Sequence, residues 1–436
     1  MTRLYTRVVQ SYRQGTAGAT GIPRVFVTGV GVVSSIGIGK HAFYESLRVG
    51  RTGLSKLVAF PAGELGRDIA GEVKDFSADD HMTRAERRNA GRCAQMAVAA
   101  ARLATKDAAM SEASLGGPRV AVVMGTTMGE GALLGDLEGA WIKSGPDAIN
   151  RAGIPRYGST LLPIHVARAL GVSGLVSTLP AACAAGNYAI GFGADLIRMG
   201  RADVVVCGAA ELLQELQFAG FVRLAAMAKE RCRPFDRDRE GLILGEGAAV
   251  LVLESEAHAV ARDATAQAEV LGMGLTCDGY HITRPHPDAA GSIEAMRQAI
   301  SRSGITPSAI DFVNAHGTGT KANDVAETKV MHDVFGDRRV PISSMKSMLG
   351  HCMGAASAIE AAGCVFTLET GIYPPTIGFE TPDPECDVDV VANVAREGKA
   401  DIILNNSLAF GGYNAVTCFS RPYKVENPGA PAKELA

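Results

Sequence analysis

The chain has 436 residues, of which 47% are hydrophobic and 20% are charged, and its formal net charge is −3. A chain of this length and composition can bury a large core and should contain two domain-sized units, and its near-neutral charge excludes a global attraction to nucleic acid or to an anionic membrane. Nine scattered cysteines form no CxxC pair, and no apolar window is long enough to span a bilayer. These features predict a cytoplasmic protein with no nucleic-acid partner, no membrane anchorage and no structural zinc.

Short β-branched segments alternate with longer Ala-rich segments of helical spacing, as in an α/β protein. The first series comprises strand 24–29, helix 87–106, strand 119–124, helix 161–170, a helix over 184–199, and strands 202–208 and 248–253. The second series comprises strand 269–275, helix 292–303, strand 310–315, helices 324–335 and 354–370, and strand 402–405. Because the order of elements roughly repeats, we expect two similar α/β halves, at 23–265 and 266–423. A disordered extension (1–22) and a flexible tail (424–436) should flank them.

Gly29-Val30-Gly31 follows the first predicted strand, as the glycines of a dinucleotide-binding loop would. The third glycine of that fingerprint is replaced by Ser34, and no suitable acidic residue follows a second strand. We therefore interpret the segment as a tight turn and not as an NAD site.

Cys183 lies between a short predicted strand, 174–179, and a helix of small residues that begins at the cysteine. The free N–H groups and the positive dipole end of that helix would favour a thiolate, and the strand-to-helix turn can present the sulfur to a cleft. A nucleophile and an ordinary core cysteine both remain open at this point, because free cysteines are often buried.

Two histidines of the second half lie in glycine-rich loops. His316 ends a predicted strand, and the small and hydroxyl-bearing residues at 317–320 permit close backbone approach and hydrogen bonds to a polar chain. Lys346 precedes His351 by five residues, ahead of a helix whose Glu360 could pair with a buried lysine.

A last loop, 405–414, places Phe410 beside Gly411 and Gly412, which can act as hinges of a mobile gate or form an oxyanion loop. Each of these loops also has a purely structural explanation: a satisfied core histidine, a salt-bridged lysine or a glycine turn.

Together and in this order, the segments resemble those of the β-ketoacyl-acyl carrier protein synthases, type II condensing enzymes of the thiolase fold, and are closest in pattern to synthase II. The resemblance covers nearly the whole chain, from about residue 23 to about residue 422. Its motifs are Ala-Cys-Ala-Ala-Gly around Cys183, His-Gly-Thr-Gly-Thr from His316, Lys-Ser-Met-Leu-Gly-His from Lys346 to His351, and Phe-Gly-Gly from Phe410, with further matches at 233–236, 238–241, 245–248 and 280–285. It implies an α/β, thiolase-like fold in which two similar halves give a layered α-β-α-β-α architecture.

The resemblance also implies the reaction, a decarboxylative Claisen condensation of fatty-acid or polyketide synthesis. Its substrates would be carried on the phosphopantetheine of an acyl carrier protein, with no other cofactor and no metal. Cys183 would be the nucleophile, and His316 and His351 would stabilise the enolate derived from malonyl-carrier. Lys346 would hold the His351 loop with Glu360, its partner within the substrate-binding set, and Phe410 would be the gate and an oxyanion donor. Thr318, Thr320 and Thr283 would bind the substrate arm. Phe221 and Met128 would line the acyl pocket, with Met128 reaching across a dimer interface.

The carrier protein is acidic in this family, so its docking surface should be basic. The candidates on one predicted helix are Arg84, Arg87, Arg88 and Arg92, for which a solvated helix face is the alternative explanation. Arg284, near the predicted channel mouth, is a further candidate. By the same resemblance we expect a dimer, either of identical chains or with a homologous ketosynthase-like subunit.

Some positions depart from the family pattern. Arg284 stands where a small residue is usual, and Ser357 replaces the last glycine of Gly-Ala-Ala-Gly. Tyr413 replaces a residue that is usually small or polar. Pro163 stands where asparagine is common, and Glu130 stands where glycine is common. Because the catalytic set is intact while pocket and channel are altered, we expect an unusual acyl substrate.

Three other functions compete with this one. A thiolase usually pairs its cysteine with one histidine and a second cysteine; Cys352 follows His351, but the His316 loop argues against a thiolase. A noncatalytic chain-length partner subunit of a ketosynthase heterodimer is the main alternative, although such subunits generally lack the reactive cysteine. A cysteine hydrolase needs an imidazole base held by a third group and gives the Lys346 loop no role.

Overall fold

The computed structural model describes residues 22–422. The predictions of a disordered extension at 1–22 and a flexible tail at 424–436 concern, apart from Ile22, segments outside the described residues. Within the described part of the chain, no helix is both long and apolar enough to cross a membrane.

Five strands of the first half form a mixed sheet with the neighbour order β1-β8-β7-β5-β6. The strand β8 is antiparallel to both β1 and β7, whereas β7, β5 and β6 run parallel. The bounds are β1 (Val25–Ser34), β5 (Val120–Gly125), β6 (Val176–Leu179), β7 (Val204–Glu211) and β8 (Gly247–Ser255).

The second half repeats this arrangement as β9-β16-β15-β10-β11, again with two antiparallel pairings followed by two parallel ones. Antiparallel pairing of Phe26 and Val27 in β1 with β9 joins the halves into one 12-stranded sheet. The bounds are β9 (Ala268–Cys277), β10 (Phe312–Asn314), β11 (Pro341–Ser343), β15 (Ile402–Ala409) and β16 (Tyr413–Ser420). The sheet also includes β2 (Gly37–Ile38), which pairs with β1, and β13 (Asp389–Val390), which pairs with β11. Two separate two-stranded sheets are formed by β3 (Ser55–Lys56) with β4 (Ile69–Ala70) and by β12 (Ile372–Tyr373) with β14 (Arg396–Glu397).

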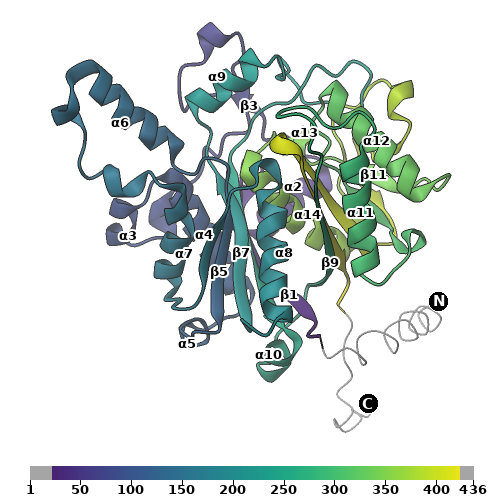
Figure 1. The fold of residues 1–436 in the computed structure, drawn as a ribbon, viewed down its shortest axis with the longest axis horizontal. Helices are drawn as coiled ribbons and strands as arrows, with labels where there is room; N and C mark the ends of the chain where they lie inside the picture. Colours follow the sequence, from purple (N-terminus) through teal and green to yellow (C-terminus); the bar gives the residue numbers. More distant parts are fainter. Residues whose placement is uncertain (1–21, 423–436) are drawn as a thin grey trace.

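The helices form three layers around the two halves of the sheet (Figure 1). Helices α4 and α7 cover the outer face of the first half, α11 and α12 cover that of the second, and α8 and α14 pack together between them. This arrangement confirms the predicted α/β, thiolase-like fold with layers α-β-α-β-α. The bounds are α2 (Lys40–Val49), α3 (Arg84–Asn89), α4 (Arg92–Asp107), α5 (Glu112–Leu115), α6 (Gly131–Ser144), α7 (Leu162–Leu170), α8 (Ala185–Arg198), α9 (Glu215–Arg223), α10 (Glu256–Ala261), α11 (Ala290–Arg302), α12 (Lys321–Phe335), α13 (Lys346–Leu349) and α14 (Ala356–Thr370).

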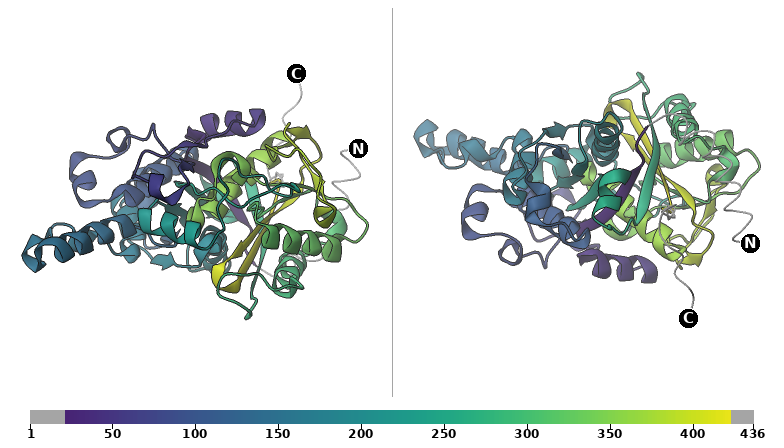
Figure 2. Two further views of the ribbon diagram at one scale, coloured as in Figure 1. Left: turned by 90° about the horizontal axis from the view of Figure 1, so that it is seen from above. Right: turned by 90° about the horizontal axis from the view of Figure 1, so that it is seen from below.

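One helix stands apart from these layers. Helix α6 extends away from the body of the molecule, as both views in Figure 2 show. Only Leu137 of this helix is a buried residue, and Trp141 and Ile142 are exposed.

The single helix predicted over 87–106 is wrong, because the chain forms α3 and α4 with a break at Ala90 and Gly91. Ala90 has extended dihedral angles, and the carboxylate of Glu130 accepts a hydrogen bond of 2.7 Å from the Ala94 N–H in the first turn of α4. A side chain at Gly91 would collide with that carboxylate, since a Cβ there would lie 2.1 Å from Glu130 Oε2. The unusual Glu130 therefore stabilises the N-terminal end of α4.

The predicted tight turn at Gly29-Val30-Gly31 is also wrong, because both glycines lie inside the continuous buried strand β1. A Cβ at Gly31 would lie 1.9 Å from the Ala100 carbonyl oxygen, so the glycine lets α4 pack directly on the strand. Gly274 of β9 does the same for α11, where the Ala295 carbonyl oxygen would be 1.8 Å from a Cβ. The glycines thus serve helix packing in both halves.

This close packing predicts that Gly31→Ala lowers the free energy of unfolding by about 1–3 kcal/mol, because the methyl group must displace α4. Urea denaturation followed by circular dichroism would measure the loss. Gly135→Ala is the matched control, since a Cβ at that exposed helical position meets nothing within 4 Å; it should be neutral or stabilising by up to about 1 kcal/mol. Equal stability of the wild type and Gly31→Ala would contradict the packing argument.

Candidate active site

Cys183 lies in a 3-10 turn, Ala182–Ala184, between β6 and α8. Ala182 has φ of 45°, a left-handed conformation that is costly for a residue with a side chain and that sharpens the turn. The matching place in the second half, between β11 and α14, holds a second 3-10 turn, Met353–Ala355, in which Met353 has φ of 47°. The two turns bring Cys183 and the neighbouring His351 together from opposite halves.

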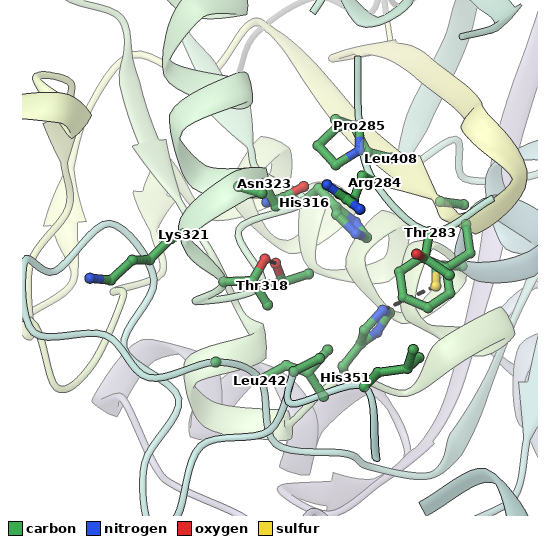
Figure 3. A pocket seen from close by; sticks show the side chains of 18 of the residues that line it. Leu242, Thr283, Arg284, Pro285, His316, Thr318, Lys321, Asn323, His351 and Leu408 are labelled. Atoms are coloured by element: carbon green, nitrogen blue, oxygen red, sulfur yellow. Dashed lines mark hydrogen bonds between the residues drawn. The ribbon is translucent and has the colours of Figure 1, made fainter. Parts of the chain in front are cut away.

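The sulfur and both imidazoles line one cavity of about 640 Å³, part of which is shown in Figure 3. Nε2 of His351 lies 3.1 Å from Sγ of Cys183, and the rings of His316 and His351 are 5.4 Å apart at an angle of 84°. All three side chains are at least nine-tenths buried. The structure therefore brings together the three residues that the sequence singled out as nucleophile and donors.

The proton positions of both imidazoles follow from their other contacts. The Met353 N–H donates to Nδ1 of His351 at 3.3 Å, and the Lys346 ammonium lies 3.4 Å from Nδ1 of His316. Backbone N–H groups and ammonium groups have no acceptor, so Nδ1 must accept in both rings and the proton is on Nε2. Burial lowers the pKa of both histidines well below the usual value, and the charge of Lys346 lowers it further. Both rings are therefore neutral donors of an Nε2–H group.

Lys346 organises the His316 side of the site. Its ammonium donates to the His316 carbonyl at 2.6 Å and to Glu360 Oε1 at 2.5 Å, and the ion pair is almost fully buried. The predicted pairing of Lys346 with Glu360, which flank the His351 loop in the chain, is confirmed, and the contact of Lys346 with His316 was not predicted. Glu360 does not line the cavity, so its assignment to substrate binding is also wrong and it acts as the counter-ion of Lys346. Burial raises the pKa of Glu360 to about 7, although Lys346 opposes this effect.

Two buried carboxylates that the sequence did not single out hold the surrounding loops. Glu327 accepts the N–H groups of His316 and Gly317 at 2.7 and 2.8 Å, and burial raises its pKa to about 7. Glu211, at the end of β7, accepts the N–H groups of Thr127 and Gly354 at 2.6 and 3.2 Å. The sequence places Glu327 on a predicted helix, 11 residues after His316. Only the packed structure shows that its carboxylate faces the His316 loop.

Cys183 differs from the prediction in its protonation. Burial raises the pKa of its thiol to about 12, so burial outweighs the helix terminus that was expected to favour a thiolate. The charge of Lys346 and the N–H groups of Phe410 and Cys183 lower this pKa in part. Those two N–H groups lie at the sulfur, where the oxyanion of an attacked thioester would form.

Comparison with known proteins agrees with this geometry. Residues 23–259 match the model of the N-terminal domain of beta-ketoacyl synthases, and residues 267–380 match that of the C-terminal domain. The chain is 36% identical to 3-oxoacyl-acyl-carrier-protein synthase 2 of Synechocystis over 91% of its own length and 98% of the relative's. It is also 36% identical to the ketoacyl synthase alpha subunit of the tetracenomycin polyketide synthase of Streptomyces glaucescens, over 93% and 98% of the two chains.

The chain belongs to the beta-ketoacyl synthase family. Among solved structures, the ishigamide ketosynthase/chain length factor is 41% identical, with a TM-score of 0.90 over 92% of this chain and 100% of that one. The predicted family and the class of enzyme, a condensing acyltransferase, are thereby confirmed.

In this ketosynthase, Phe410 forms the wall of the cavity beside the sulfur. It begins a short turn, Phe410–Gly412, in which Gly411 and Gly412 have φ of 84° and 78°, values that favour glycine. The Phe410 ring stacks on Phe221 with centroids 5.4 Å apart. Both rings line the cavity, as predicted for the gate and the acyl pocket.

Of the other predicted substrate-binding residues, Thr283, Thr318 and Thr320 line the same cavity. Met128 does not line it in this chain; its side chain is half-buried and its N–H donates to Glu211. A contribution of Met128 across a dimer interface stays a prediction. Among residues 22–422, no cluster of three or more His, Cys, Asp or Glu side chains could hold a metal ion.

The predicted docking arginines fall into four groups. Arg84 and Arg88 are exposed on α3 and make no ion pair with any described residue. Arg87 pairs with Asp79. The guanidinium of Arg92 bonds the buried Glu246 at 2.8 Å and the Val73 carbonyl at 2.6 Å, although its side chain is 37% exposed, so its role in docking stays a prediction. Arg284 is exposed at the cavity, apart from this helix.

Ser357 explains one departure from the family pattern. Its buried hydroxyl donates to the Cys183 carbonyl at 3.2 Å and accepts from the Asn187 N–H at 3.0 Å. A regular α-helix would join those two backbone groups directly. Ser357 therefore stands inside the first turn at the nucleophile, and it lies three residues from Glu360 on the same buried helix, α14.

The position of this hydroxyl predicts that Ser357→Ala slows acylation of Cys183 about tenfold, because two buried backbone groups lose their partner and the turn can close and move the sulfur. Decarboxylation of malonyl-carrier should change little, since Lys346 and the Met353 N–H still hold the histidines. Mass spectrometry of the acyl adduct and release of labelled carbon dioxide would measure the two steps.

Ser357→Thr, which keeps a hydroxyl, should recover part of the acylation rate. Ser46→Ala is the matched control, because Ser46 is also fully buried and bonds a carbonyl, that of Ile36. It should lower stability without changing the ratio of the two rates. Equal loss of both steps in Ser357→Ala would show a merely structural role.

Proposed function

We propose that this ketosynthase condenses a Cys183-bound acyl group with malonyl-carrier protein, releasing carbon dioxide and giving 3-oxoacyl-carrier protein. The observation that carries the proposal is the 3.1 Å separation of Cys183 Sγ and His351 Nε2 in a cavity that His316 also lines. A relative named for 3-oxoacyl-carrier synthesis and another named as a polyketide synthase subunit support fatty-acid or polyketide synthesis as its context.

The first half-reaction transfers the acyl group to sulfur. Cys183 attacks the thioester carbonyl, and the N–H groups of Cys183 and Phe410 stabilise the oxyanion. The carbon–sulfur bond to the first carrier then breaks, and the carrier thiol leaves with the proton that Cys183 gives up. Lys346 supplies the positive field that makes this deprotonation accessible from a thiol of high pKa.

The second half-reaction needs neutral donors. When malonyl-carrier loses carbon dioxide, the electron pair of the broken carbon–carbon bond moves to the thioester oxygen, which the Nε2–H groups of His316 and His351 can stabilise as an enolate. The nucleophilic carbon then attacks the acyl-Cys183 carbonyl, and the sulfur leaves as a thiolate, which takes up one proton from water to restore the thiol. No redox cofactor or metal is needed, because every electron pair comes from the substrates.

The partners follow from the same proposal. An acyl carrier protein delivers both substrates, and the enzyme works as a dimer, with itself or with a homologous chain-length subunit such as the one named in the ishigamide structure. The intact Cys183, His316 and His351 set favours a catalytic subunit over the noncatalytic partner. Its place is the cytoplasm.

The two half-reactions predict opposite outcomes for two variants. Cys183→Ala should form no adduct with acyl-carrier yet still decarboxylate malonyl-carrier, because the histidines remain. His351→Ala should keep acylation within a few fold and slow decarboxylation about 10²–10³-fold, as expected for loss of one oxyanion donor. Arg201→Ala, at an exposed arginine outside the cavity lining, is the control. Failure of the wild type to form an adduct with any acyl-carrier would favour the noncatalytic partner function.

A second prediction concerns docking on α3. Replacing the exposed Arg84 and Arg88 together by Glu should lower kcat/KM with an acidic carrier about tenfold, with most of the effect lost at high salt. Acylation by a small-molecule thioester should be unchanged. Arg201→Glu, at an exposed arginine beyond the far end of α8, is the control. An equal loss of acylation with the small-molecule thioester would show that the substitutions damage the fold and would contradict a role in docking.

A further inference from the structure

Tyr413 closes the hairpin that carries Phe410. Strands β15 and β16 pair up to Ala409 and Tyr413, so the turn between them, Phe410–Gly412, has three residues. Both glycines of the turn have positive φ, which lets the chain reverse so tightly. Tyr413 departs from the family pattern, which has a small or polar residue at this position, and its side chain is 37% exposed.

The ring of Tyr413 folds back over this turn. A Cβ on Gly411 would lie 2.9 Å from Cε2 and 3.1 Å from Cδ2 of Tyr413, so the ring lies against the backbone of Gly411. The same ring contacts Tyr188, with ring centroids 5.9 Å apart at an angle of 89°. Edge-to-face pairs of this kind are attractive beyond the apolar area that they bury. The Tyr413 ring therefore connects the turn to Tyr188.

Tyr188 gives the turn a fixed neighbour. It lies on α8, five residues after Cys183, and α8 packs against α14 in the middle of the molecule. A further contact of the turn, from the Gly411 N–H to the Ile282 carbonyl at 2.7 Å, is made to the loop between β9 and α11. Ile282 is exposed, so that loop can move together with the turn, whereas α8 is held by its packing.

The turn sets two properties of the nucleophile. The Phe410 N–H lies at the Cys183 sulfur, where it lowers the pKa of the thiol in part. The Phe410 ring stacks on Phe221, and both rings pack in the apolar cluster that contains Cys183, which is 5% exposed. Displacement of the turn would therefore open the wall beside the sulfur and remove an oxyanion donor at the same time.

We infer that Tyr413 is a positioning residue whose ring, held by Tyr188, keeps the turn Phe410–Gly412 closed beside Cys183. A small side chain at position 413 would lack both ring contacts, so the restraint belongs to this chain and not to the general family pattern. The inference rests on the proposed function, since it assigns the closed turn to the step in which Cys183 is acylated. The expected consequence is a site that opens rarely and holds its oxyanion donor firmly while it is closed.

The test measures how fast N-ethylmaleimide alkylates Cys183, because alkylation needs access to the sulfur but no oxyanion donor. The parent protein is Cys277→Ser, since an adduct on Cys277, whose Sγ lies 3.6 Å from the Gly411 carbonyl oxygen, would itself disturb the turn. Peptide mass spectrometry follows the adduct. Tyr413→Ala should raise the rate about three- to tenfold, as expected for the loss of one aromatic pair. Exposure of the sulfur should also lower the pKa of the thiol, because burial is the largest cause of its high value.

The control variants separate the ring contact from general damage. Tyr413→Phe, which keeps the ring, should react at the rate of the parent. Tyr188→Ala should raise the rate as Tyr413→Ala does, and the double variant should stay within about twofold of the single variants, because both substitutions remove the same contact. Tyr280→Ala, at an exposed tyrosine whose ring packs on His286, is the matched control and should change nothing. Cys207, fully buried in β7, should stay unmodified throughout and reports any loss of the fold.

Acylation of Cys183 by a small-molecule thioester should change in the opposite direction. Tyr413→Ala should slow it about three- to tenfold, because the Phe410 N–H is held less firmly where the oxyanion forms. Unchanged alkylation in Tyr413→Ala would overturn the inference. So would fully additive effects in the double variant, or acylation that accelerates together with alkylation.

Condensation with malonyl-carrier, measured on the parent protein, separates this inference from the proposed function. A parent that forms no acyl adduct, but whose alkylation depends on Tyr413 and Tyr188 as described, would refute the condensation and leave the restraint standing. A parent that is acylated and condenses, but whose alkylation does not depend on Tyr413, would do the reverse.

Discussion

The buried charge of Lys346 is the constraint on which the rest of the site depends. An ammonium that is 1% exposed is stable only because Glu360 and the His316 carbonyl bind it closely. That charge disfavours protonation of both histidines, fixes the proton of His316 on Nε2, and opposes the effect of burial on the Cys183 thiol. Burial is the larger cause of the pKa shift in all three reacting side chains, and this one ion pair adds a second effect at each of them.

The second constraint is the internal repeat. The nucleophile turn before α8 and the turn after His351 before α14 occupy equivalent places in the two halves, and each contains a residue with positive φ, Ala182 and Met353. Because α8 and α14 pack against each other, the two turns meet. The site thus exists only in the docked pair of halves, and Ser357 couples them at the sulfur through two hydrogen bonds.

The layered fold and the reacting groups could be predicted from the sequence, because short segments of the chain are enough to indicate them. Alternating periodicity predicts the layered α/β fold, and the loops around Cys183, His316 and His351 identify the reacting groups. Features that depend on distant packing could not be predicted. Glu327 and Glu211 have no local motif, the glycines of β1 resemble a turn until α4 is placed on them, and the ion pair of Arg92 with the distant Glu246 has no signal in the sequence. The pKa of Cys183 depends on burial by both halves, which outweighs the helix terminus visible in the sequence.

The central position of α8 has a consequence for how the chain must fold during synthesis. The apolar side of α8 that packs on α14 has no cover until residues up to 370 have left the ribosome. At usual elongation rates this interval is on the order of ten seconds or more, and during it the nascent first half exposes an apolar surface that can associate with other polypeptides. Chaperone dependence, and the loss of truncated products to aggregation, would follow from the same geometry that encloses the thiol in the finished protein.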